Sequence, residues 1–375
     1  MAGGAAPPVE PEGRAARRPL PRRAKIALAL LALLWAFVSA SPFVMAALGQ
    51  GGGFVDKLIP IRLPATLVLV VALVSTDIWR RGGSLRLWAR DVFWNRRVAI
   101  EALAVALFLV TLPFWARTSL SYAFLFPWTD YLAVPAEEGL ACEEVSLPRE
   151  GTAPLTGWFL PASGERAARA AVLLSNGNAA NMSQLLDHAS ILHDLGCSVL
   201  LYDYQGFGRS PGSRDVGSLA GDARTAAAWL RGKAAPLPLV AFGISMGTQP
   251  TARLAAEKRC DAVILESVFQ ADRELAARFR WIPPLVWALR PGIPEEFDMA
   301  GNLEVAGSMP KLFLHGTDDN LTPYPRAQAL FDDAPGPKRW VEFPGAGHLE
   351  PVLDRRAYRE ALRAFLDAAL PTPRY

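Results

Sequence analysis

The sequence predicts an α/β fold in which helices flank a mostly parallel sheet, preceded by about three transmembrane helices. From about residue 140 onward, short apolar runs alternate with helical patterns, which is typical of a parallel sheet covered on both faces. Before residue 117, three apolar runs approach the length that spans the hydrocarbon core of a bilayer. The 375-residue chain is also 51% hydrophobic with a positive mean hydropathy, which indicates membrane content.

The first third of the chain divides into a tail, a membrane region and a linker. Residues 1–24 are rich in Ala, Pro, Gly and Arg, and we expect them to be disordered. We expect a membrane region over 25–117 and an interfacial linker over 118–139. The predicted membrane helices cover about 26–49, 58–79 and 98–116. The first could instead be a cleaved signal peptide, the second is the weakest, and the second and third could instead be buried helices.

Loop charges predict the orientation of this region. Six Lys or Arg residues precede the first apolar run, and six Arg lie between the second and third runs, against the single Asp91. The loop between the first and second runs is short and nearly neutral. Because positively charged loops stay in the cytoplasm, we expect everything after Arg117 to lie outside the cytoplasmic membrane, in the periplasm or the extracellular space. The net charge of only +3 gives no reason to expect a nucleic-acid partner.

Residues 140–375 are long enough to form one domain. Two runs, 143–148 and 157–162, predict an opening pair of strands. Further apolar runs predict strands at 170–176, 197–204, 237–244, 261–267, 311–316 and 339–345. Helical patterns occupy 181–194, 218–232, 246–258, 324–333 and about 352–369. Because ligands of such sheets bind at the carboxyl ends of the strands, we look there for a site.

Residues Gly243-Ile244-Ser245-Met246-Gly247 read G-x-S-x-G at one such end. The motif follows an apolar run and precedes a helical pattern, which is the context of a nucleophile elbow. The turn is so tight that small residues are needed at Gly243 and Gly247. The sequence therefore predicts that Ser245 is a nucleophile.

A serine hydroxyl needs a base, which an acid must orient. His348 follows the last predicted strand in a glycine-flanked loop, where the base is expected. Asp318 and Asp319 both follow the preceding strand, and position alone does not separate them. His188 and His193 lie in a helical pattern before the serine and are expected to be surface or packed histidines, and His315 is expected to pack or to hydrogen-bond locally.

An oxyanion hole requires two backbone amides beside the nucleophile. The Met246 N–H at the elbow is one candidate. The second candidate is the N–H of Asn178, in the loop that follows the strand at 170–176, where Gly177 lets the backbone turn inward. The alternative is that this loop is an ordinary Asn/Gly turn.

Six stretches together resemble the α/β-hydrolase superfamily, most closely its membrane-anchored serine hydrolases. They are "SNGNAANM", "LYDYQGFGRSPG", "FGISMG", "LES", "LHGTDDNLTP" and "GAGHLE", in that order, and the resemblance covers about residues 135–370. The family pattern H-G-x-x-D-x-x-x-P implies that the acid is Asp319. Where the family's oxyanion loop usually begins with His-Gly, this chain has Asn176-Gly177. The resemblance also implies that Asp203 and Gly208 hold a structural turn beside the site.

The resemblance further implies a cap over the active site at about 268–310. Its apolar residues could line an acyl pocket or form the core of the cap: Trp281, Leu285, Val286 and Trp287.

The expected function is hydrolysis of an ester or thioester by a membrane-anchored serine hydrolase with the triad Ser245, Asp319 and His348. We expect a small-molecule or lipid-like acyl substrate, because the site would lie beside a bilayer. Small-peptide hydrolysis and non-catalytic binding on the same fold are the alternatives. No cofactor or metal is required, and the sequence leaves the oligomeric state open. The three cysteines, Cys142, Cys197 and Cys260, contain no C-x-x-C pair and are expected to be buried or unpaired thiols.

Overall fold

A computed structural model describes residues 72–78, 80, 103, 110, 112, 116–122, 124–162, 168–281 and 283–370. The chain divides into two units, 1–115 and 116–375. The predicted N-terminal tail and the predicted membrane helices 26–49, 58–79 and 98–116 lie almost entirely outside the described residues. Of the first unit, residues 72–78 are helical. Among the described residues, no helix has the length and apolar character needed to cross a bilayer.

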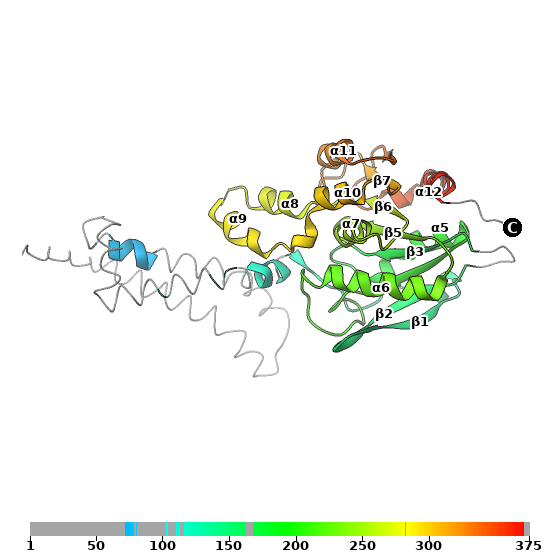
Figure 1. Ribbon diagram of the computed structural model, residues 1–375, viewed down its shortest axis with the longest axis horizontal. Coiled ribbons are helices and arrows are strands. Elements are labelled where there is room, and N and C mark those ends of the chain that lie inside the picture. Colours follow the sequence, from blue (N-terminus) through cyan, green and yellow to red (C-terminus); the bar gives the residue numbers. More distant parts are fainter. Residues whose placement is uncertain are drawn as a thin grey trace, which may run out of the picture. The chain divides into compact units, whose positions relative to one another are not determined.

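An eight-stranded sheet forms the centre of the second unit (Figure 1). Its strands follow the order β1-β2-β4-β3-β5-β6-β7-β8. They are β1 Glu143–Arg149, β2 Thr152–Leu160, β3 Ala170–Ser175, β4 Cys197–Tyr202, β5 Leu239–Ile244, β6 Ala262–Glu266, β7 Lys311–Gly316 and β8 Lys338–Phe343. β2 pairs antiparallel with β1 and β4, and all other pairs are parallel. The predicted α/β fold with a mostly parallel sheet is confirmed.

Helices connect the strands and cover the sheet. The α-helices with assigned bounds are α5 Leu186–Asp194, α6 Leu219–Ala234, α7 Thr248–Ala256, α8 Ala271–Arg278, α9 Pro283–Leu289, α10 Met299–Ala306, α11 Tyr324–Asp333 and α12 Arg355–Ala369. Short 3-10 helices are η1 Pro135–Glu138, η2 Met182–Leu185, η3 Ser245–Gly247, η4 Arg290–Gly292, η5 Glu295–Phe297 and η6 Pro351–Leu353. Residues 116–122 and 124 are also helical.

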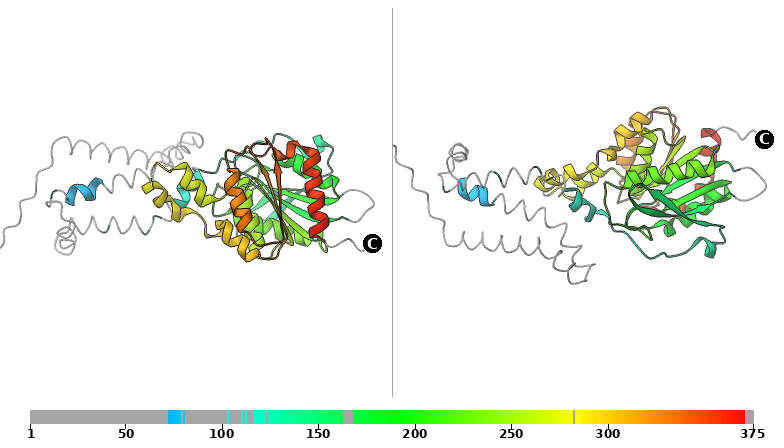
Figure 2. Two further views of the ribbon diagram at one scale, coloured as in Figure 1. Left: turned by 90° about the horizontal axis from the view of Figure 1, so that it is seen from above. Right: turned by 60° about the horizontal axis from the view of Figure 1, so that its bottom comes forward.

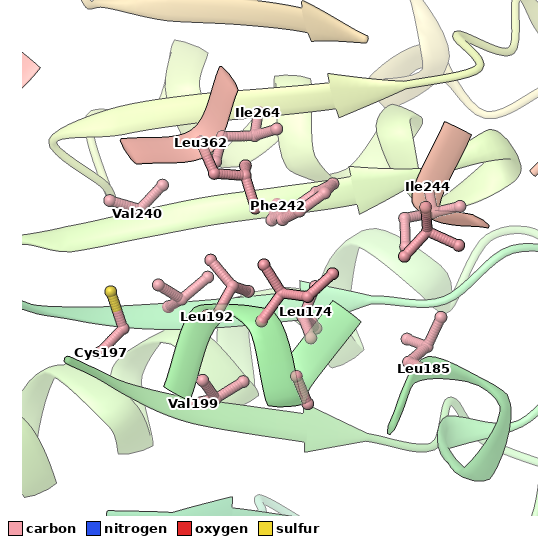
Figure 3. Close-up of a cluster of buried hydrophobic side chains, with 14 of the residues drawn as sticks. Leu174, Leu185, Leu192, Cys197, Val199, Val240, Phe242, Ile244, Ile264 and Leu362 are labelled. Atoms are coloured by element: carbon pink, nitrogen blue, oxygen red, sulfur yellow. The ribbon is translucent and has the colours of Figure 1, made fainter. Parts of the chain in front are cut away.

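The central strands are buried on both faces because helices cover each side. Successive side chains of a strand point to opposite faces. Ile264 of β6 therefore belongs to the cluster under α5 and α12, whereas its neighbour Leu265 packs with residues of α7, α10 and α11. Figure 3 shows the first cluster, in which Leu192 of α5 and Leu362 of α12 meet strand residues such as Phe242. This double coverage explains the continuous apolar runs in the sequence.

Helix α12 shows how local sequence fixes one of these elements. The Asp354 side chain accepts a hydrogen bond from the Ala357 backbone N–H and caps the first turn. Tyr358, Leu362 and Phe365 recur at helical spacing and are buried against the sheet. The helix thereby holds the chain that follows β8 against the core.

The chain between β6 and β7 contains three α-helices with different positions in the fold. α8 and α9 lie together beyond one end of the sheet (Figure 2). α10 instead packs on α7, and its Met299 and Leu303 belong to the core. The range predicted for the cap, 268–310, therefore extends too far at its C-terminal end, because α10 is part of the main layer of helices.

Candidate active site

A strained turn between β5 and α7 presents Ser245. Its φ of +52° lies in the left-handed region, which costs energy for any residue with a Cβ. A Cβ on Gly243 would lie 2.3 Å from the carbonyl oxygen of Gly247, and a Cβ on Gly247 would lie 2.2 Å from that of Ser175. Both positions therefore require glycine, and the G-x-S-x-G spacing follows from these two close approaches. Ser245 remains 5% exposed.

Three side chains from separate loops form one hydrogen-bonded chain. The Ser245 Oγ lies 3.0 Å from His348 Nε2, and His348 Nδ1 lies 2.8 Å from Asp319 Oδ2. A carboxylate can only accept, so the Nδ1–H donates to Asp319 and Nε2 is left to accept the serine proton. This is the arrangement that a general base needs in order to activate a hydroxyl nucleophile.

Hydrogen bonds keep the Asp319 carboxyl ionised. Burial alone would raise its pKa, but bonds from His348 and from the backbone and hydroxyl of Thr322 outweigh burial and hold the pKa below its ordinary value. The Thr322 Oγ1 donates to Asp319 Oδ2 over 2.7 Å, and the Thr322 N–H donates to Oδ1 over 2.8 Å. Asp319 therefore remains an anion that can stabilise a protonated His348.

Close contact between two loops brings the acid and the base together. A Cβ on Gly316, the last residue of β7, would lie 2.2 Å from the carbonyl oxygen of Ala346 in the His348 loop. The Asp318 N–H donates to that same Ala346 oxygen over 2.9 Å. The Asp318 side chain is exposed, whereas Asp319 is buried. The structure therefore selects Asp319 from the two acids that sequence position left open.

The loop after β3 lies against the nucleophile. A Cβ on Gly177 would lie 3.3 Å from the Ser245 Cβ. The Asn178 side chain connects this loop to residues 124–126: its Oδ1 accepts from the Phe126 N–H over 2.8 Å, and its Nδ2 donates to the Phe124 carbonyl. The Asn178 backbone N–H donates no hydrogen bond to any other described residue. Asn178 and Met246 both line the space beside Ser245, and the role of their N–H groups as oxyanion donors stays a prediction.

A cavity of about 360 Å³ opens beside Ser245. Such a volume is in the range of small-molecule sites. Its wall is mostly apolar, with Leu120, Phe124, Leu125, Phe126, Val216, Met246, Phe269, Leu275, Ile293, Phe297 and Leu321 among the lining residues. Four of these belong to residues 120–126, which we predicted to be part of an interfacial linker. The described residues of that segment therefore also form a wall of the cavity.

Known proteins with similar sequences identify the family to which this chain belongs. Residues 166–294 match the family described as serine aminopeptidase, S33. An uncharacterised protein of Mycobacterium tuberculosis strain H37Rv is 35% identical over 216 residues, which cover 56% of this chain and 74% of that protein. The chain belongs to the α/β-hydrolase family. This hydrolase is also 30% identical over 215 residues to α/β-hydrolase domain-containing protein 17C of Xenopus tropicalis, covering 54% of this chain and 63% of the relative.

Solved structures share the fold of this hydrolase. An esterase of Pyrococcus furiosus superposes with a TM-score of 0.54 and 16% identity, covering 66% of this chain and 99% of the esterase. The α/β hydrolase GrgF of a Penicillium species superposes with a TM-score of 0.51 and 20% identity, covering 62% and 99% of the two chains. At these identities the likeness extends to the fold alone.

The turn at "DYQGFGRS" has the structural role that the resemblance implied. Asp203 is buried, and its carboxylate accepts hydrogen bonds from the Met182 N–H, the Arg209 N–H and the Tyr131 hydroxyl. Gly208 has a φ of +47°, and a Cβ there would lie 1.8 Å from Asp203 Oδ2. The hydrolase thus uses Asp203 to fix two loops beside the site.

Neither form of the expectation for the cap holds for its two tryptophans, whereas Leu285 and Val286 are half-buried and can still belong to the core of the cap. The Trp281 side chain is 81% exposed and that of Trp287 is 62% exposed, so neither forms a core. Neither of them lines the cavity, and nor does Leu285 or Val286. The cavity instead uses the face of α8 that carries Leu275.

The other three histidines and the three cysteines lie outside the hydrogen-bonded chain of Ser245, His348 and Asp319. His188 lies beside Glu266, His193 Nε2 lies 3.2 Å from the Pro161 carbonyl, and His315 Nε2 lies 2.8 Å from the Thr322 carbonyl. Burial lowers the pKa of His315. The three thiols are free, with Cys142 exposed and Cys197 and Cys260 buried. No group of three His, Cys, Asp or Glu side chains within the described ranges could hold a metal ion.

Two functional features escaped the sequence reasoning. The Thr322 hydroxyl shares Asp319 Oδ2 with His348, and no motif signals this contact. The tie between Asn178 and residues 124–126 joins positions more than 50 residues apart, so only the fold brings them together. The aromatic run that contains Phe124 and Phe126 was noticeable in the sequence, but it was assigned to a membrane interface.

Proposed function

We propose that this protein hydrolyses ester or thioester bonds of acyl or lipid-like substrates through an acyl-enzyme on Ser245. The observation that supports this most strongly is the chain of two hydrogen bonds from Ser245 through His348 to Asp319. That chain ends at an apolar cavity large enough for a small-molecule acyl group.

The proposed reaction has two halves. The Ser245 Oγ attacks the carbonyl carbon while His348 Nε2 takes the hydroxyl proton, and the Met246 and Asn178 N–H groups hold the oxyanion. The bond to the leaving group then breaks, and His348 returns its proton to that group. Water attacks the acyl-enzyme by the same route, and Ser245 is regenerated. Asp319 orients His348 and stabilises its charge throughout.

A fluorophosphonate probe tests the nucleophile directly. The wild-type protein should be labelled at Ser245, and the S245A variant should not. Peptide mapping of the labelled protein gives the site, and circular dichroism checks that the variant is folded. Absence of labelling in correctly folded wild type would contradict the proposal and would favour a non-catalytic binding protein.

Small-peptide hydrolysis is the second candidate, because residues 166–294 match a family described as serine aminopeptidase. An amide has a poorer leaving group than an ester, so activity on p-nitrophenyl esters alone does not exclude it. Aminoacyl p-nitroanilides should be compared with p-nitrophenyl esters, monoacylglycerols and lysophospholipids. A higher kcat/KM on the anilides would replace the ester proposal with the peptidase one.

We further propose that residues 26–49, 58–79 and 98–116 anchor the protein in the cytoplasmic membrane, with the hydrolase region outside. Support comes from the apolar lengths and from the positive charges of the intervening loops. Protease added to intact cells, or to spheroplasts where an outer membrane exists, should cut the chain after residue 117. Cleavage that requires lysis would contradict this orientation.

A further inference from the structure

Two ionisable side chains are among the described residues that line the cavity, and within those residues only one of them has an ionic partner. Both come from α8, where Glu274 and Arg278 are separated by four residues. The Glu274 carboxylate accepts a hydrogen bond from Arg326 Nη1 of α11 over 2.9 Å, so its charge is already balanced. The remaining lining residues are apolar or neutral.

Arg278 is the cation left over. Its guanidinium carbon lies 5.4 Å from the centroid of the Phe124 ring, which also lines the cavity. Within the described residues no carboxylate lies within 4 Å of it, including that of Glu274. A guanidinium held over an aromatic ring keeps its hydrogen-bond donors free for a planar or tetrahedral anion.

We propose that the cavity takes acyl substrates bearing one anionic group, a carboxylate or a phosphate, and that Arg278 binds this group. The inference rests on the proposed function, since it places the anion in the same cavity as Ser245. Apolar side chains would hold the hydrocarbon part of the substrate, and Arg278, the one unpaired cation among the described lining residues, would discriminate against neutral and cationic analogues. Arg278 is thus a specificity-determining residue.

A binding measurement tests this inference without relying on turnover. The full-length S245A variant in a non-ionic detergent is titrated with octyl phosphate, octanoate and octanol, with calorimetry giving each dissociation constant. At least one anion should bind about tenfold more tightly than octanol, and this advantage should fall as salt is raised. The comparison of phosphate with carboxylate identifies the preferred anion.

Arg280 provides the matched control, because it is two residues away on the same segment, stacks on Trp281 at 4.9 Å and does not line the cavity. In the S245A background, R278Q should remove the advantage of the anions, R278K should restore part of it, and R280Q should leave it intact. Equal binding of anions and octanol by S245A, or equal effects of R278Q and R280Q, would overturn the inference.

Turnover separates this inference from the proposed function. With Ser245 present, the kcat/KM ratio of a monoacylglycerol phosphate to the corresponding monoacylglycerol, or of a dicarboxylic acid hemi-ester to its ω-amide, should be about tenfold and should depend on Arg278. Absence of fluorophosphonate labelling in the folded wild type would refute the catalytic role of Ser245, whereas the binding constants for the anions would still decide the role of Arg278.

Discussion

At the scale of single residues, the two adjacent acids Asp318 and Asp319 give the sharpest comparison. Only Asp319 contacts His348, and its depressed pKa keeps it ionised. The D319N variant would lose the acceptor that fixes the His348 tautomer, and kcat should fall by about 10⁴-fold. The D318N variant should keep kcat within about twofold, because its side chain is exposed. Steady-state hydrolysis of a p-nitrophenyl ester measures both, and equal losses would contradict the assignment.

The Asn178 side chain permits a second residue-scale prediction. Removing its two bonds to residues 124–126 in N178A should let the proposed oxyanion loop shift, so kcat should fall about ten- to a hundredfold. The control is N320A, because Asn320 also lines the cavity but is exposed and, within the described residues, makes no hydrogen bond to this loop. If N320A lowered kcat as much as N178A, the lower kcat would result from a change in the cavity surface and not from the lost hydrogen bonds to residues 124–126.

How far these residues could be predicted depends on what fixes them. Ser245 and His348 follow from position, because a parallel sheet gathers its strand ends at one edge. The choice of Asp319 required either a family pattern or the contact with His348. The hydrogen bond from Thr322 to Asp319 and the hydrogen bonds of the Asn178 side chain to residues 124–126 could not be predicted. They depend on how loops pack against each other in the folded protein.

At the scale of elements, Glu257 links two helices through three arginines. It is the C-cap residue that follows α7, and it accepts hydrogen bonds from Arg224 of α6, from Arg253 of α7 and from Arg259. Burial would raise its pKa, but the three guanidinium groups outweigh burial and lower the pKa to about 2. A lowered pKa in the folded state means that this stabilisation is present above pH 4.5 and is lost as the pH falls toward 2.

The E257Q variant should therefore have a free energy of unfolding about 1 kcal/mol lower than that of wild type at pH 7. This figure already allows for solvent screening, because Glu257 is partly exposed. The difference should shrink as the pH falls from 4.5 toward 2. Denaturant unfolding of both proteins at several pH values measures it. E360Q is the control, because Glu360 pairs only with the exposed Arg356 on α12. A difference that did not change with pH would contradict the ionic origin of the effect.

The strands and helices were largely predictable, whereas the extent of the cap and the exposure of its tryptophans were not. Continuous apolar runs predicted the central strands because both faces of the sheet are covered. Trp281 and Trp287 were expected to line the pocket or to form the core of the cap, but both are exposed. Tryptophan content alone does not distinguish a buried position from an exposed one. The end of the cap was also misplaced, because α10 returns to the core at Met299.

At the scale of the whole molecule, the hydrolase region begins before its first strand. Arg117 donates two hydrogen bonds to Asp215, at 2.9 and 2.6 Å, and the Ser121 hydroxyl accepts from the Val216 N–H over 3.0 Å. Phe124 and its neighbours then line the cavity. Residues 116–126 are therefore part of the site as well as the connection to the first unit.

A pair of truncations tests this boundary. A chain beginning at residue 116 should fold and hydrolyse a short soluble ester with kcat/KM within about threefold of the full chain, because the cavity wall is kept. A chain beginning at residue 127 should lose at least about a hundredfold, because four lining residues and the partners of Asn178 are gone. Thermal unfolding shows whether each chain is folded. Equal activity of the two folded truncations would contradict the boundary.

The central claim is that Ser245 forms the acyl-enzyme, and pre-steady-state hydrolysis of a p-nitrophenyl ester tests it most directly. We expect a burst of p-nitrophenol that does not exceed one equivalent of protein, with one acyl group detected by intact mass and located on Ser245 by peptide mapping. S245A should show neither burst nor adduct, and its kcat should fall by at least about 10⁴-fold. Hydrolysis by folded S245A at the wild-type rate, or an acyl group found on another residue, would contradict the account.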